Sequence, residues 1–84
     1  MQDSRFTYVY ILRSLVDASA HYTGCTQDLQ ARLKKHNEGA VTHTARLKPW
    51  KIETAISFRD SAKARAFEKY LKSGSGREFA RRHF

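Results

Sequence analysis

The chain has 84 residues, 40% of them hydrophobic and 12% aromatic, which suffices for the core of one small domain and excludes an intrinsically disordered chain. Sixteen Lys and Arg residues against eight Asp and Glu give a net charge of +8, which favours a polyanionic partner. The single cysteine excludes an intramolecular disulfide and a zinc site built from cysteines, and no apolar stretch is long enough to span a membrane.

Two strands joined by a short loop are predicted at the start of the chain. Residues 6–13 are strong strand formers that alternate between two faces. Residues 14–20 include an aspartate and several small residues, which are typical of a hairpin loop, and residues 21–24 return as a second, short strand. Tyr10 and Tyr22 then come from adjacent strands, and we expect both to project to the same side of the sheet.

A helix is predicted to follow as the chain turns through Gly24. Thr26 is the expected N-cap and Gly39 the expected stop. The residues at i, i+3, i+4 and i+7, which should face the core, are Leu29, Arg32, Leu33 and His36. An arginine and a histidine are costly to bury unless an anion meets them, so this helix is predicted to present a site as well as to fill a core.

A loop and a third strand are predicted next. Residues 40–49 lack periodicity and are rich in basic and hydroxyl side chains, which indicates an exposed basic loop or a short irregular turn. Residues 50–58 alternate apolar and polar side chains, which predicts a half-buried strand. One continuous face of that strand, from Trp50 to Phe58, is expected to be buried.

The last part of the chain is predicted to be helical. Asp60 or Ser61 should cap a helix that runs to about residue 73. Its apolar stripe is expected to consist of Ala64, Phe67, Tyr70 and Leu71. The Ser-Gly-Ser-Gly sequence of residues 73–76 should break this helix, and residues 77–84 have room for one or two more turns anchored by Phe79.

The positive charge belongs to the second part of the chain, because residues 1–31 carry a net charge of −1 and residues 32–84 carry +9. The candidates for contacts with a phosphate backbone are Lys34, Lys35, Arg46, Lys48, Lys72 and Arg77. The alternative is that these side chains only keep the domain soluble.

The tripeptides Tyr8-Val9-Tyr10 and Tyr22-Thr23-Gly24, followed in order by Arg32, His36 and Glu68, resemble the GIY-YIG nuclease domain. Tyr8 replaces the glycine of the first motif, and Thr23 replaces the isoleucine of the second. The resemblance covers nearly the whole chain, as a single domain of residues 1–84. It implies an α+β fold with a mixed three-stranded sheet flanked by helices, in the order β-β-α-β-α with a further short helix.

The same resemblance implies roles for five residues. Glu68 would bind one divalent metal ion, Mg²⁺ or Mn²⁺, and Arg32 would hold the scissile phosphate. Tyr10, Tyr22 and His36 would orient or deprotonate the attacking water. A lone carboxylate suits Mg²⁺, which keeps several of its waters, and a guanidinium suits the charge that grows on phosphate oxygens. Either a tyrosine or the histidine could be the general base.

The function expected from the resemblance is a metal-dependent DNA endonuclease of low intrinsic sequence specificity, structure-directed in DNA repair or recombination. RNA is not excluded as a substrate, and a cytoplasmic monomer or weak dimer, nucleoid-associated when bound to DNA, is expected. The alternatives are a nucleic-acid-binding module without turnover and a domain that binds an acidic protein. In those cases the tyrosines would be core aromatics, Arg32 and His36 would extend past the leucines, and Glu68 would only pair with Lys72.

Overall fold

The centre of the sheet is β1 (Thr7–Ser14), which pairs with β2 (His21–Thr26) on one side and β3 (Trp50–Phe58) on the other. The computed structural model, which describes residues 5–84, confirms the α+β class and the predicted order of elements. Both ladders are antiparallel, so the expectation of a mixed sheet was wrong. The strands β2 and β3 do run parallel to each other, but β1 lies between them, so they never pair.

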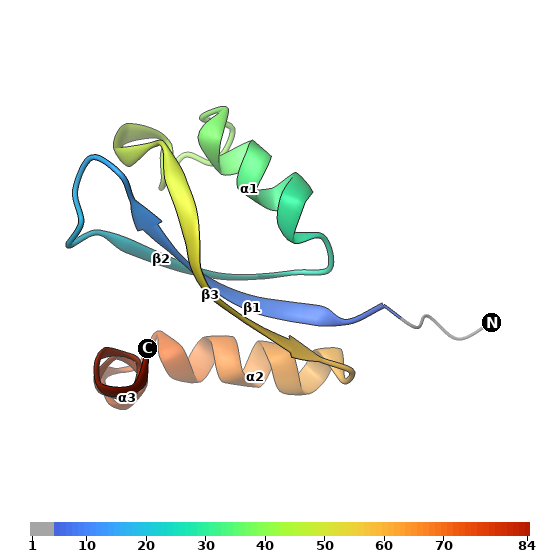
Figure 1. The fold of residues 1–84 in the computed structure, drawn as a ribbon. Coiled ribbons are helices and arrows are strands. Elements are labelled where there is room, and N and C mark those ends of the chain that lie inside the picture. Colours follow the sequence, from blue (N-terminus) through green and yellow to red (C-terminus); the bar gives the residue numbers. More distant parts are fainter. Residues whose placement is uncertain (1–4) are drawn as a thin grey trace.

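Helices cover both faces of this sheet (Figure 1). The helix α1 (Leu29–Asn37) lies on one face, and α2 (Ser61–Leu71) and α3 (Gly74–His83) lie on the other. The strand β1 is therefore buried on both faces: Val9 and Ile11 pack toward α2, while Tyr10 and Leu12 belong to a second cluster on the side of α1. No helix within residues 5–84 is long and apolar enough to cross a membrane.

The strand β3 has an irregularity that the sequence pattern did not predict. Ile11 of β1 pairs with Thr54, but the next residue, Leu12, pairs with Ile52, so Glu53 is an extra residue in β3. Paired residues share a face of the sheet, so β3 changes faces at this bulge. Ile52 packs in the cluster on the side of α1, whereas Phe58 packs in the cluster on the side of α2. The predicted alternation of burial along β3 is confirmed, but the less exposed residues do not all lie on one face of the sheet.

The start of α1 differs from the prediction by two residues. The strand β2 continues through Gly24 to Thr26, and Asp28 is the N-cap, since its carboxylate accepts a hydrogen bond from the Ala31 amide at 3.0 Å. The Thr26 hydroxyl instead accepts from the Asp28 amide at 3.1 Å and orders the turn that leads into the helix. The predicted stop is confirmed, because Gly39 has a φ of 80°, a conformation that favours glycine.

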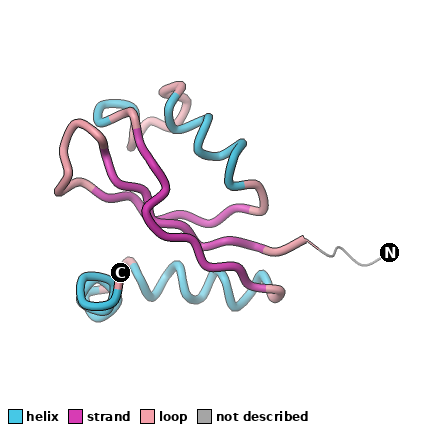
Figure 2. The backbone as a smooth tube through the Cα atoms, in the orientation of Figure 1, coloured by secondary structure: helices cyan, strands magenta, loops and turns pink. Residues whose placement is uncertain are grey.

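Figure 2 shows the loop between α1 and β3. Its residues are only partly exposed. It contains a short 3-10 helix, η1 (Ala45–Leu47). Arg46 and Lys48 are exposed as expected, but Thr44 is 1% exposed. The prediction of an exposed basic loop or a short irregular turn therefore missed only that Thr44 reaches the interior.

Asp60 caps α2, as one of the two predicted alternatives, and the helix ends at Leu71. The following Ser-Gly-Ser-Gly segment is not a linker, because Ser73 caps α3 and both glycines lie in its first turn. A Cβ atom at Gly76 would lie 2.6 Å from Leu71 Cα and closer still to the Tyr70 carbonyl. The glycine therefore lets α3 begin directly against the end of α2.

Candidate active site

A polar cleft of about 360 Å³ lies along β2, between the start of α1 and the middle of α2. Its lining residues are Thr7, Tyr10, Tyr22, Gly24, Cys25, Thr26, Gln27, Arg32, Arg65 and Glu68. Four of the five residues predicted for the site, Tyr10, Tyr22, Arg32 and Glu68, thus line one cleft. The fifth, His36, lies behind the cleft, fully buried under the rings of the two tyrosines.

Both ring nitrogens of His36 are engaged inside the protein. The Tyr10 hydroxyl lies 3.0 Å from Nε2, and the Thr44 hydroxyl lies 2.8 Å from Nδ1. Thr44 Oγ1 also donates to the Val41 carbonyl at 3.2 Å. Because the only proton of that hydroxyl goes to the carbonyl, Nδ1 must be the protonated nitrogen of a neutral His36. Nε2 is then the acceptor for the Tyr10 hydroxyl.

The protonation states of this pair agree with the hydrogen-bond assignment. Burial, and next the neighbouring Tyr22, raise the pKa of Tyr10 to about 12, although Arg32 acts in the opposite direction. Burial, and next the positive charge of Arg32, lower the pKa of His36 below its ordinary value. At neutral pH the pair is therefore a neutral phenol donating to a neutral imidazole.

Hydrogen bonds at Thr44 and at Trp50 hold the segment between them in place. The Trp50 indole donates to the Thr44 carbonyl at 2.8 Å. The Asn37 side chain at the end of α1 accepts from the Trp50 amide at 2.6 Å and donates to the Trp50 carbonyl at 3.1 Å. These bonds fix the hydroxyl of Thr44 against His36. Sequence reasoning missed Thr44, because a threonine in a basic loop carries no signal of burial.

Gly24 lies within β2 and not at the predicted turn. A Cβ atom at this position would lie 2.6 Å from Tyr10 Cζ and closer still to the hydroxyl. Gly24 pairs with Tyr10 across the ladder, so the phenol lies over the bare backbone of β2. The glycine therefore makes room for the Tyr10 hydroxyl to reach His36.

The cleft also holds two guanidinium groups. Arg32 comes from α1 and Arg65 from α2, and neither forms an ion pair with another residue in the described part of the chain. Arg65 was missed by sequence reasoning, although it precedes Glu68 by three residues and so had to share its helix face. Two guanidiniums in a concave polar site, without an ion pair in the described residues, are suited to a phosphate anion.

Glu68 fits both the metal-binding role and the alternative of an ion pair with Lys72. Its carboxylate lines the cleft, and it also pairs with Lys72 at 2.8 Å, one helical turn later. Within residues 5–84, no group of three or more His, Cys, Asp or Glu side chains converges on a metal-sized site. A single carboxylate beside hydroxyl groups and open to water still suits Mg²⁺, which takes most of its ligands from water and phosphate.

The six residues predicted to contact a phosphate backbone are all exposed. Lys34 and Lys35 lie on α1 and Arg46 and Lys48 on the loop after it, on the side of the sheet opposite α2. Lys34 forms a loose ion pair with Glu38 at 3.8 Å. Lys72 and Arg77 lie instead at the junction of α2 and α3, so the six residues do not form one surface.

The sequence is similar to a known family and to a known protein. A family profile described as the GIY-YIG catalytic domain matches residues 6–81. The chain is also similar to a Podospora anserina protein named structure-specific endonuclease subunit SLX1, with 41% identity over 66 residues. The match covers 71% of this chain but only 19% of that protein's length. No solved structure matches the chain.

Proposed function

This chain belongs to the GIY-YIG catalytic-domain family, and on that premise we propose that it is a metal-dependent endonuclease that hydrolyses phosphodiester bonds in DNA. The observation that carries the proposal is the content of the cleft: two guanidiniums without an ion pair in residues 5–84, one carboxylate, and a phenol hydrogen-bonded to a buried imidazole. These are the groups that phosphodiester hydrolysis requires, namely stabilisers of negative charge and a proton acceptor.

The guanidiniums would stabilise the negative charge. A phosphodiester carries one negative charge, which grows on its non-bridging oxygens as water attacks. Arg32, in the first half of α1, would bind the scissile phosphate. Arg65, on the facing helix, would bind the same phosphate or its neighbour. Because phosphate oxygens are the same at every base, a site of this kind gives low sequence specificity.

The proton of the attacking water is proposed to leave through Tyr10. As the water gives a proton to the phenol oxygen, the phenol gives its own proton to His36 Nε2, and the imidazole becomes a cation. A free phenolate is not formed at neutral pH, because the pKa of Tyr10 is about 12. An incoming phosphate would offset the charge of Arg32, one of the two causes that lower the pKa of His36, and so would favour the transfer.

Glu68 is the residue that would bind the divalent metal ion, which when bound polarises the phosphate and the water that attacks it. The Lys72 ammonium pairs with the same carboxylate at 2.8 Å, and this ion pair would have to break before a metal ion binds. Tyr22 lies beside His36 with 4.9 Å between ring centres, and its hydroxyl would help to position the water.

The substrate is proposed to be DNA selected by its structure, such as a branch or a flap, in repair or recombination. The name of the Podospora anserina relative supports this choice, since it describes a structure-specific endonuclease.

The test is cleavage of branched, nicked and linear DNA of one sequence in Mg²⁺ or Mn²⁺. Glu68→Gln should abolish cleavage, whereas Glu38→Gln, an exposed carboxylate one turn from Lys34, should retain it. Equal cleavage by the wild type and Glu68→Gln, or no cleavage by the wild type with either metal, would contradict the proposal.

A second candidate is a DNA-binding module without turnover. The ion pair between Glu68 and Lys72 favours it, because it occupies the carboxylate that a metal ion would need. In that case the wild type should bind DNA with a steep salt dependence, keep that affinity after Glu68→Gln, and show no cleavage.

A further inference from the structure

A second and larger cavity, of about 770 Å³, lies between the sheet and α3. We call it the α3 groove. Its lining residues are Ile11, Ser19, His21, Tyr22, Thr23, Glu53, Leu71, Lys72, Arg77, Ala80, Arg81 and Phe84. None of the functions discussed so far uses this cavity, although its volume is typical of a ligand site.

The α3 groove combines apolar walls with cations. Ile11 of β1 and Ala80 of α3 contribute aliphatic surface, and the ring of Phe84 is 43% exposed. Lys72 and Arg77 are basic residues of this lining: Lys72 pairs with Glu68, whereas Arg77 forms no ion pair within residues 5–84. Apolar and aromatic surface flanked by cations is the composition of sites that bind unpaired nucleotides, whose bases stack while their phosphates meet the charges.

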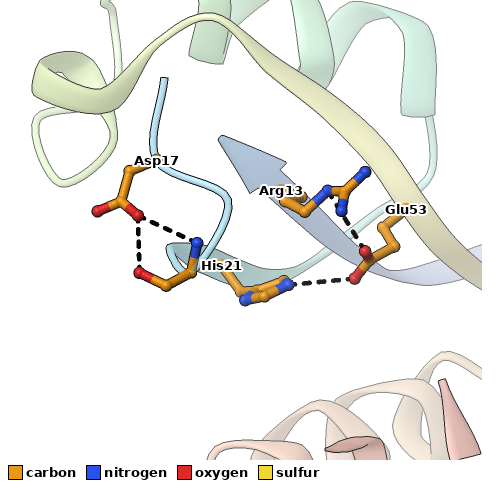
Figure 3. Close-up of polar contacts among 5 residues, drawn as sticks. Arg13, Asp17, His21 and Glu53 are labelled. Carbon is orange, nitrogen blue, oxygen red and sulfur yellow. Dashed lines mark hydrogen bonds and ion pairs between the residues drawn. The ribbon is translucent and has the colours of Figure 1, made fainter. Parts of the chain in front are cut away.

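The one carboxylate of the sheet that lines the α3 groove is already neutralised. Glu53 is the extra residue of the β3 bulge, and its oxygens lie 3.5 Å from Arg13 Nε and 3.2 Å from His21 Nε2 (Figure 3). It therefore does not oppose an anionic ligand with a free negative charge.

The α3 groove adjoins the candidate active site. Tyr22 borders both cavities. Lys72 stands between them, with its ammonium 2.8 Å from Glu68 and 6.0 Å from the centre of the Tyr22 ring. A polynucleotide chain in the cleft can therefore extend past Lys72 toward Arg77, both of which lie in the lining of the adjoining groove.

From this arrangement we propose that the α3 groove binds single-stranded DNA adjacent to the bond that is cut. The inference rests on the proposed function and deepens it, because it assigns an unpaired strand as the part of the substrate that this face recognises. A duplex presents its phosphates but keeps its bases stacked inside, so it would leave the apolar walls of the groove unused. An unpaired strand can place bases on those walls and phosphates against Lys72 and Arg77.

The test is binding without catalysis, by fluorescence polarisation of a labelled 12-nucleotide oligo-dT in EDTA, compared with a DNA hairpin duplex. Arg77→Gln should weaken oligo-dT binding about fivefold and reduce the slope of log K against log salt by about 0.7, the value for one lost phosphate contact on a single strand. Arg82→Gln removes the same charge from the same helix at an exposed position outside the groove, and should change the affinity less than twofold. Amide NMR shifts on adding oligo-dT should include Ile11, Thr23 and Ala80.

Equal losses in the two arginine variants, or shifts confined to the cleft, would overturn the proposal. Tighter binding of the duplex than of oligo-dT would overturn the choice of a single strand. Tighter binding of oligo-U than of oligo-dT would overturn the choice of DNA. Displacement of oligo-dT by poly-Glu at equal charge would overturn the choice of a nucleic acid and indicate an acidic protein instead. Because the assay contains no metal and measures no cleavage, its outcome is independent of whether the protein proves to be a nuclease.

Discussion

Replacing Thr44 with valine tests the hydrogen-bonded support of the candidate site. Valine keeps the shape of threonine but removes the hydroxyl that accepts from His36 Nδ1 and donates to the Val41 carbonyl. His36 is fully buried, so its Nδ1 proton would have no partner and no water. An unsatisfied buried polar group costs about 1–3 kcal/mol, and the free energy of unfolding should fall by about that amount. For a domain of this size, each kcal/mol corresponds to about 4–8 °C in Tm.

The assay is urea unfolding at pH 7.5, followed by the fluorescence of Trp50, the only tryptophan of the chain. Thr44→Ser, which keeps the hydroxyl, should recover most of the lost stability. Thr42→Val, an exposed site in the same loop, should have the wild-type midpoint. In ¹⁵N NMR spectra of the wild type, Nε2 of neutral His36 should be the unprotonated nitrogen. The reasoning is refuted if Thr44→Val is as stable as the wild type, or if Nδ1 proves to be the unprotonated nitrogen.

Three further predictions concern the same site. Because the pKa of His36 is lowered in the folded protein, only the unfolded chain takes up this proton as the pH falls through about 6.5. The free energy of unfolding should therefore decrease below that pH, and less steeply in His36→Gln; parallel pH profiles would contradict this. Gly24→Ala should push away the phenol that bonds to His36 and cost about 1–3 kcal/mol, whereas Gly74→Ala, with nothing within 4 Å of its Cβ, should be neutral in the same urea assay. Lys72→Met should tighten Mn²⁺ binding in calorimetry, because the ammonium no longer competes for the carboxylate, while Lys69→Met should not; equal affinities would argue against a metal at this carboxylate.

Local patterns predicted most of the fold, because burial in a small domain follows hydrophobic periodicity. The three strands, and the helices that begin near residues 28 and 60, were predicted to within two residues. The misses depend on tertiary structure. The bulge at Glu53 leaves the alternation in the sequence unchanged while it reverses which face is buried. The predicted helix break is confirmed, but α3 already begins at Gly74, because Gly76 lets it pack against the end of α2.

Part of the candidate site was predictable for a physical reason. Arg32 and His36 stand on the inward face of α1, where charged or titratable side chains are unusual, so their spacing alone marked them. The separation between them was not predictable: Arg32 faces the cleft, while His36 lies behind Tyr10 with no exposed surface. Thr44 and Arg65 were missed because their importance comes from contacts with residues distant in the sequence.

The two-sided burial of β1 has a consequence for when the protein can act. Tyr10, His36 and Thr44 belong to the core on one face of the sheet, whereas Arg65 and Glu68 are carried by a helix packed on the other. The same three strands contribute side chains to both cores, and α2 is among the last elements to be synthesised. A chain in which α2 has not docked on the sheet lacks the Glu68 carboxylate opposite the phenol–imidazole pair. The set of groups proposed for phosphodiester hydrolysis is therefore complete only when both layers are in place.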